Sequence, residues 1–406
     1  MSYQPGLGGS PWDPPPSGSA GGAPQWYEGS QGQPAFPGPS GGAQDPWGGA
    51  TGPAPEQWSM PPEPQSLPPF NLPPSPSPKP WLKWVLIATV VIVIVAVTAV
   101  VITVVKSEGS STGDSETVSA APSDIASAGD KEPVSIVIED ASCDAQIPIF
   151  KNFYEGIKAS GYDDMDRTVP ASLWSPEERR SASEAKRVTA ATIAQMGPLV
   201  KLTTHRVMRE LYEQTMAYWQ AWIDKVPTYV GSDDAYWAAG NSGERAIIKM
   251  CEALRYKPAQ ARSFLADPPI PPKSFSEVTS ATPQPFLAGG ADQCGEYTAA
   301  MAAYYDDPVI DQWLKIDYKI VASGWDSNQR QLTEKAGDIL IKLAHKLSNL
   351  GSDSGNPVMA DFTAMGAQYL TAYAHALPSY TPNDNYLLNA GLALVRLVNF
   401  GCKAAA

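Results

Sequence analysis

The four cysteines define an internal repeat in the C-terminal part of this chain. Cys143 and Cys251 lie 108 positions apart, and Cys294 and Cys402 have the same separation. When the chain is shifted by 151 positions, the second pair falls on the first, and roughly twenty overlaid positions are identical without a gap. Self-similarity at a fixed offset indicates one structural unit that is built twice. The repeat therefore predicts two similarly folded modules, which we place at residues 134–256 and 291–406.

The first 80 residues have a different composition from the repeat. They hold 22 of the 40 prolines and 14 of the 33 glycines of the 406-residue chain, and they contain no arginine or cysteine. A segment so poor in aliphatic side chains cannot bury enough surface to offset its ordering entropy, so residues 1–80 are predicted to be disordered. Two interpretations stay open for its four tryptophans, which are either part of an inert tail or anchors for a cytoplasmic partner: Trp12, Trp26, Trp47 and Trp58.

An uncharged apolar stretch follows the tail, from Trp84 to Val105. About 22 residues at about 1.5 Å each are long enough to cross the hydrocarbon core of a bilayer, so residues 84–105 are predicted to be a transmembrane helix. Lys79 and Lys83 precede this stretch, whereas Lys106 alone follows it before an acidic run. The positive charges favour a cytoplasmic N-terminus in the cell membrane. All four cysteines then lie on the outer, oxidising side.

The repeated module has the pattern of a helical bundle. Ser175 with Glu178, and Asp326 with Gln329, form capping boxes at the start of matching apolar periodic segments. Proline at 227 and at 378 ends the next segment in each copy. The spacing predicts an all-α fold, with four helices in each of two tandem four-helix-bundle-like modules outside the cytoplasm.

The predicted bundle also selects the disulfides. In an up-down-up-down bundle, the start of the first helix and the end of the fourth lie at the same end. We therefore expect Cys143 to pair with Cys251, and Cys294 with Cys402. Residues 107–133 are interpreted as a flexible stalk and residues 257–290 as a proline-rich linker between the modules. For residues 134–138 the sequence does not decide between a strand and an extra helical turn.

Reactive groups are scarce in the repeat. Its three histidines, at positions 205, 345 and 375, are not matched by a histidine in the other copy. No metal-binding, phosphate-binding or catalytic motif fits its context, so we expect no catalytic residue, no metal and no cofactor. The net charge of −13 and the absence of a basic stripe argue against nucleic-acid binding.

Some polar residues recur in both copies and are candidates for either structure or binding. Each set contains a tyrosine in a turn, an aspartate at a helix start and an arginine further along that helix: Tyr229, Asp233 and Arg245, and Tyr380, Asp384 and Arg396. The aspartates suit the helix dipole, and the arginines suit an ion pair with Asp166 or Asp317. The first copy adds Trp219, Trp222 and Trp237, which are either core residues or the lining of a groove for a lipid or peptide.

The opening MSYQPGLGGSPWDPPP, the Val/Ile-rich span and the cysteine-bearing outer part together resemble actinobacterial, mycobacterial-type, single-pass cell-envelope membrane proteins. The resemblance implies a place in the plasma membrane facing the cell wall. We therefore expect a membrane-anchored interaction or scaffold protein that binds an envelope protein or a lipid through its duplicated modules. Two alternatives are a transmembrane sensor that signals to the tail, and a wall-acting enzyme that uses carboxylates such as Asp163 and Asp164.

Overall fold

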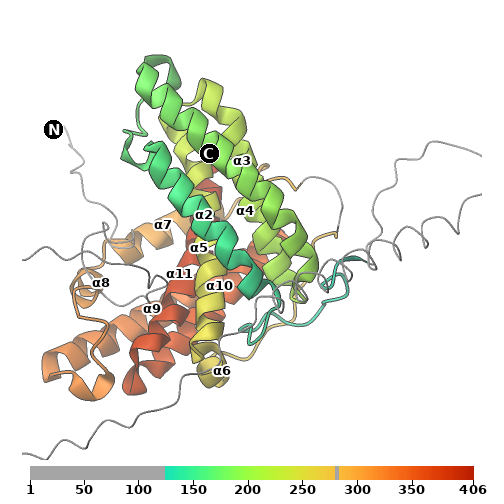
Figure 1. The fold of residues 1–406 in the computed structure, drawn as a ribbon. Helices are drawn as coiled ribbons and strands as arrows, with labels where there is room; N and C mark the ends of the chain where they lie inside the picture. Colours follow the sequence, from blue (N-terminus) through green and yellow to red (C-terminus); the bar gives the residue numbers. More distant parts are fainter. Residues whose placement is uncertain (1–123, 279–282) are drawn as a thin grey trace, which may run out of the picture. The chain divides into compact units, whose positions relative to one another are not determined.

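The structure of this protein is a computed structural model that describes residues 124–278 and 283–406 (Figure 1). The predicted tail with its four tryptophans, the predicted span 84–105 and the first part of the predicted stalk lie outside the described residues. Within the described residues, every regular element is a helix and there is no strand. The all-α prediction is therefore confirmed for this part of the chain.

Four long helices form the first copy of the repeat: α2 (Ser142–Ser160), α3 (Pro176–Leu202), α4 (Arg206–Lys225) and α5 (Asp234–Arg255). The start of α3 is fixed by the predicted capping box, in which Ser175 accepts a hydrogen bond from the Glu178 backbone N–H while the Glu178 side chain accepts from the Ser175 N–H. At the C-terminal end of α2, Gly161 has a φ of 74°, a left-handed conformation that ends the helix and that glycine adopts at little cost.

The second copy repeats these helices at the same offset. α9 (Ser327–Asp353) and α10 (Pro357–Ala376) match α3 and α4 in both bounds, and α11 (Asn385–Ala404) starts at the position that matches the start of α5. The first helix differs, because it is divided into α7 (Cys294–Tyr305) and α8 (Pro308–Trp313). Pro308 cannot continue the preceding helix, and Asp307 caps the new one by accepting from the Val309 N–H at 2.8 Å. The second copy thus has a short additional helix, α8, where the first copy continues α2.

The two copies pack directly against each other. α5 and α11, the last helices of the two copies, lie side by side at the centre of the fold (Figure 1). A Cβ on Gly243 of α5 would lie in ordinary contact with Leu397 of α11, at 3.6 Å, and the rings of Tyr256 and Tyr386 stack at 4.8 Å. The described residues consequently belong to one compact unit with a shared interface, rather than to two modules joined only by a linker.

The end of the predicted stalk and the predicted linker are held against the helices. Ser127 is buried, and the Ala126 N–H donates to the carbonyl of Lys201, so the end of the predicted stalk is part of the fold. The predicted linker begins with the short helix α6 (Pro258–Arg262) and is then fixed to α4 and α10 by side-chain hydrogen bonds. Residues 134–138 form neither a strand nor a helix, although Val137 is only 1% exposed.

Helix α11 together with the turn before it, Pro382–Ala404, is long and apolar enough by composition to cross a membrane. Its most apolar window is 72% buried within the protein, however. We therefore attribute its apolar character to its central place in the core rather than to a bilayer.

Two disulfides are present, with the expected pairing. Cys143 bonds to Cys251 and Cys294 bonds to Cys402, each joining the first helix of a copy to its last. In each pair the Cα atoms are 5.2 Å apart, which is within the range for unstrained disulfides. Each bond closes a loop of more than a hundred residues.

Candidate functional site: two equivalent turns and a buried charge cluster

The tyrosines and aspartates shared by the copies fasten equivalent turns. The Tyr229 hydroxyl donates to the carbonyl of Arg167 at 2.7 Å, and the Tyr380 hydroxyl donates to the carbonyl of Tyr318 at the same distance. Asp233 and Asp384 each accept from the backbone N–H three residues earlier, at 2.9 and 2.8 Å. These side chains hold a helix–helix connection in place, which is the structural interpretation of the repeat.

The two aspartates differ in their ionic partners. Asp233 lies 3.6 Å from the ammonium group of Lys225, whose side chain is 48% exposed. Asp384 is 2% exposed and accepts two hydrogen bonds of 3.0 Å from the guanidinium of Arg262, which belongs to α6. The bidentate pair binds the segment between the copies to the turn of the second copy, so Asp384 has a bridging function that Asp233 lacks.

The two shared arginines lie partly buried on α5 and α11. The charge of Arg245 acts on Tyr154 and Glu244, and the guanidinium of Arg396 lies 5.8 Å from the centre of the Phe400 ring. Asp166 accepts hydrogen bonds from Thr168. The expected pairing of these arginines with Asp166 and Asp317 stays a prediction.

The tryptophans of the first copy form part of a closed aromatic core. Trp219 and Trp222 are 0% exposed and Trp237 is 1% exposed. The rings of Trp222 and Trp237 are 4.5 Å apart, and the Trp222 indole N–H donates to the Tyr162 hydroxyl at 3.1 Å. In this arrangement the three side chains pack against one another and against α2, so they act as core residues.

A buried cluster of charges lies where the two copies meet, and sequence analysis missed it. The cluster comprises Arg206, Arg209 and Glu210 of α4 and Asp361 of α10, each no more than 2% exposed. Arg206 donates to the two carboxylate oxygens of Asp361 at 2.6 and 3.3 Å. Glu210 and Asp361 are 151 positions apart and are therefore equivalent residues of the repeat. A carboxylate at the same place in the equivalent helix of both copies was the signal available in the sequence.

The cluster favours a protonated carboxyl group. Burial, together with the nearby charge of Asp361, holds the pKa of Glu210 well above its ordinary value. Burial also raises the pKa of Glu213, although its partner Arg209 opposes the shift. The Glu210 oxygen Oε1 accepts from the Ser276 hydroxyl, while Oε2 has no hydrogen-bond partner within the described structure. A neutral Glu210 could donate from that oxygen.

Besides its own helix α4, three segments of the chain converge on Arg206. Beyond Asp361, its guanidinium donates to the carbonyls of Asp130 and Glu132 in the segment before α2. The Asp130 carboxylate accepts from the Arg206 backbone N–H at 2.6 Å and so caps α4. On the linker side, the ring of Phe275 covers the guanidinium at 4.9 Å. The side chain of Arg206 thus connects both copies to the segments that enter and join them.

A second buried carboxyl group, Glu244 of α5, lies outside this cluster. It is 1% exposed and accepts from the Tyr154 hydroxyl of α2 at 2.8 Å. Burial raises the pKa of Glu244 to about 7. The equivalent position in the second copy is Val395, so this carboxyl group is a property of the first copy alone.

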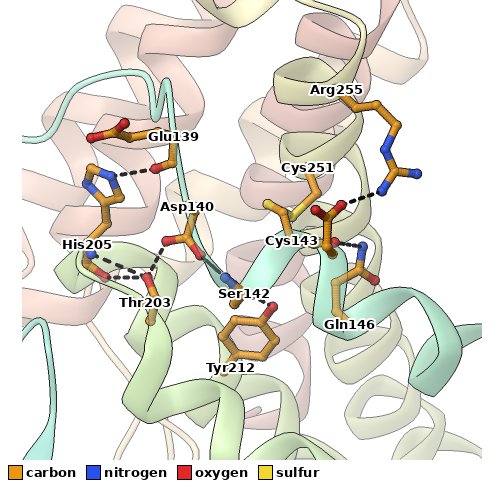
Figure 2. The surroundings of a disulfide bond; sticks show 11 residues. Glu139, Asp140, Ser142, Cys143, Gln146, Thr203, His205, Tyr212, Cys251 and Arg255 are labelled. Carbon is orange, nitrogen blue, oxygen red and sulfur yellow. Dashed lines mark hydrogen bonds and ion pairs between the residues drawn. A yellow bond between two sulfur atoms is a disulfide. The ribbon is translucent and has the colours of Figure 1, made fainter. Parts of the chain in front are cut away.

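Around the first disulfide, hydrogen bonds secure the start of α2 (Figure 2). The Asp140 carboxylate accepts from the backbone N–H of Ser142 and the hydroxyl of Thr203, and the Tyr212 hydroxyl donates to Ser142 Oγ at 2.9 Å. Nε2 of His205 lies 2.9 Å from the carbonyl of Glu139. The residues around this cysteine pair are arranged to support the chain, and among the described residues no group of side chains is suited to hold a metal ion.

The other two histidines contact the segment between the copies. Nδ1 of His375 lies 2.8 Å from the carbonyl of Leu265, and Nε2 of His345 is 3.6 Å from the carboxylate of Asp267. Asp163 and Asp164, considered above for an enzyme, belong to a short 3₁₀ turn after α2. The structure therefore does not bring the histidines together with these acids.

Comparison with known proteins identifies the family. The model of the mycobacterial ESX-1 associated protein family matches residues 125–406, which is more than half of the chain. An uncharacterized protein of Mycolicibacterium smegmatis strain MKD8 is 34% identical over 338 residues, covering 82% of this chain and 89% of the relative. No solved structure matches the chain. By its match along the whole repeat, this chain belongs to the family of mycobacterial ESX-1 associated proteins.

Proposed function

We propose that this protein is a membrane-anchored scaffold of the mycobacterial envelope that acts in association with the ESX-1 system. The observation that carries the proposal is the family match over residues 125–406, which covers the whole duplicated helical part. The two copies then form an outer platform for a protein or lipid partner, and residues 84–105 form the anchor. The N-terminus is cytoplasmic in this arrangement.

The relative from Mycolicibacterium smegmatis supports the inclusion of the anchor. A continuous match that covers 82% of a 406-residue chain includes residues 84–105 wherever it begins. The aligned region therefore extends beyond the helical part into the predicted span. The disulfides are a second support, because such bonds persist on the oxidising side of a membrane.

The use of the shared polar residues supports a scaffold over an enzyme. The tyrosine and aspartate that recur in each copy bind backbone groups of their own turns. Reactive side chains at equivalent positions would be expected if a duplicated unit had kept a reaction. Here the shared tyrosines and aspartates stabilise the turns of the helical framework. A duplicated framework of this kind is best suited to present a binding surface to a partner.

Crosslinking in intact mycobacterial cells tests the proposal. The full chain carrying a C-terminal tag would be crosslinked in a strain with an ESX-1 system and in one that lacks it, and its partners identified by mass spectrometry. We expect an envelope protein of that system, or a lipid, to be captured only in the first strain. Identical crosslinks in both strains would refute the association with ESX-1.

The anchor and its direction need a separate test. Single cysteines placed at Ser66 and at Ser115 would be labelled in intact cells with a membrane-impermeant maleimide. We expect labelling at position 115 and none at position 66, because only position 115 lies outside in the proposed orientation. The reverse pattern would overturn the orientation, and recovery of the chain in the soluble fraction would overturn the anchor.

A sensor is the second candidate, and it is favoured by the contacts of Arg206. The segment that follows the predicted span is held by this side chain at the junction of both copies. A ligand that changes the packing of the copies would therefore act on the chain leading to the membrane. Deletion of residues 1–78 would then abolish the cellular phenotype while the outer helices stay folded. An unchanged phenotype would argue for the scaffold.

A further inference from the structure

The segment between the two copies displays a short proline-rich stretch on the surface of the protein. Its sequence is Pro268-Pro-Ile-Pro-Pro-Lys273, and residues 268–271 are all exposed. Ile270 is 75% exposed, and Phe264 just before the stretch is 76% exposed. These two are the most exposed large apolar side chains in the described residues. An apolar side chain so far from the core has no packing role in this structure.

Proline chemistry fixes the conformation of the stretch. Each proline holds its own φ near −65°, and the residue before a proline is restricted to extended or polyproline II conformations. Asp267, Ile270 and the first proline of each pair all precede a proline. The backbone of residues 267–272 is therefore restricted to polyproline II geometry without internal hydrogen bonds.

Both ends of the stretch are fastened to the helices. Before it, the carbonyl of Asp267 accepts from the Gln368 amide of α10 at 2.8 Å. After it, the ring of Phe275 packs on the guanidinium of Arg206 of α4 at 4.9 Å. A free chain would lose conformational entropy on binding, whereas a chain already held at both ends loses less.

We call the proline-rich stretch from Pro268 to Pro272, with its fastened ends, the arch. Ile270 is its middle residue.

We propose that this arch is a docking site for a protein domain with an aromatic-lined groove for polyproline II helices. Prolines at 268 and 271 have the Pro-x-x-Pro spacing that such grooves bind. Ile270 supplies an apolar side chain between them. Lys273 offers a positive charge at one end, because its ion pair with Asp353 joins two side chains that are each 70% exposed and is easily exchanged. A carboxylate beside the partner's groove would complement it.

The test uses the full chain in detergent and a purified SH3 domain as the probe, since this class binds Pro-x-x-Pro ligands. Binding would be measured by isothermal titration or fluorescence anisotropy, next to a synthetic peptide of residues 266–274. We expect the intact chain to bind at least as tightly as the peptide, because its arch is already ordered. The double change Pro268→Ala and Pro271→Ala should weaken binding at least tenfold, and Lys273→Glu severalfold.

Leu173→Ser is the matched control, because Leu173 is an exposed apolar residue, at 73%, elsewhere on the surface. It should leave binding unchanged. Binding of the peptide without binding of the chain would show that the arch is not presented, and binding of neither would overturn the groove chemistry. The inference depends on neither the anchor nor the association with ESX-1. If the chain binds the SH3 domain but the crosslinking in cells captures no ESX-1 partner, that result counts against the proposed function alone.

Discussion

The two copies of the repeat share the same turn hydrogen bonds and the same disulfide, but different side chains fill the core of each copy. In the first copy, Trp219 packs against Gly240, where an added Cβ would lie 2.3 Å from the indole ring. In the second copy, the equivalent residues are Leu370 and Gly391, where an added Cβ would lie 2.8 Å from the leucine side chain. The equivalent glycines Gly240 and Gly391 thus make room for an indole ring in one copy and for a smaller aliphatic side chain in the other.

The difference extends to the approach of the helices. A Cβ on Gly391 would also lie 3.1 Å from the carbonyl oxygen of Gly366, so two glycines bring the backbones of α10 and α11 together. The residue equivalent to Gly366 in the first copy is Thr215. In the first copy Thr215 instead faces Gly243 of α5, where an added Cβ would lie 2.3 Å from the threonine hydroxyl. The comparison teaches that turn contacts maintain the frame while core volume adapts.

The disulfides provide the largest test of this equivalence. Both close loops of the same length, with a sequence separation of 108. The chain-entropy model therefore predicts the same loss, about 4–5 kcal/mol in the free energy of unfolding, for Cys143→Ser with Cys251→Ser and for Cys294→Ser with Cys402→Ser. Urea unfolding of the full chain followed by circular dichroism would measure both. Losses that differ by more than about 2 kcal/mol would break the equivalence of the copies.

The side chains that face these glycines, Trp219 and Leu370, provide a test of how the two cores differ. Trp219→Ala should lower the free energy of unfolding by about 3–5 kcal/mol, and Leu370→Ala by a smaller amount within about 2–5 kcal/mol. The indole leaves a larger cavity and its N–H loses the 2.9 Å hydrogen bond to Asn241. Thermal or urea unfolding would rank the two variants. A larger loss for Leu370→Ala would contradict the expectation that the indole fills more of the core than the leucine.

A change of pH separates the copies through Glu244, whose equivalent is Val395. The pKa of Glu244 is raised from 4.5 to about 7 by burial, so the folded state keeps a proton that the unfolded state releases. This contribution is complete below pH 4.5 and is lost as the pH rises through 7, and the loss is at most about 3 kcal/mol. Glu244→Gln should remove that dependence.

The measurement is the free energy of unfolding of both proteins between pH 4.5 and pH 9. Glu210 also contributes to the slope, because its pKa is raised too, so the difference between wild type and Glu244→Gln isolates one group. Glu244→Gln keeps a side-chain oxygen that can accept from Tyr154. Parallel curves for the two proteins would show that Glu244 is ionised in the folded state.

Local signals in the sequence were sufficient for the helices and the disulfides. Capping side chains and prolines act on neighbouring backbone, so Ser175, Asp326 and Pro227 predicted helix ends directly. The cysteine pairing followed from the offset together with bundle geometry. The division of the first helix in the second copy also has a local cause, because Pro308 interrupts it and Asp307 caps the short helix that follows.

Long-range packing could not be derived in the same way. The cluster around Arg206 joins α4 to α10, and α5 packs on α11, because the outer faces of the two copies are complementary. No periodicity within one copy specifies such a partner. Composition alone indicates that the segment between the copies is a linker. Its docking depends on single contacts, such as the ion pair of Arg262 with Asp384, which composition does not specify.

The smallest expected effect concerns the turn tyrosines, which make the same hydrogen bond in both copies. Tyr229→Phe and Tyr380→Phe each remove a hydroxyl that donates at 2.7 Å to a backbone carbonyl. Both should lower the free energy of unfolding by about 1 kcal/mol, because one hydrogen bond is lost and the ring is retained. Their sum should appear in the double variant, because additivity holds for independent sites. Unequal losses would show that the two turns are not equivalent in the folded protein.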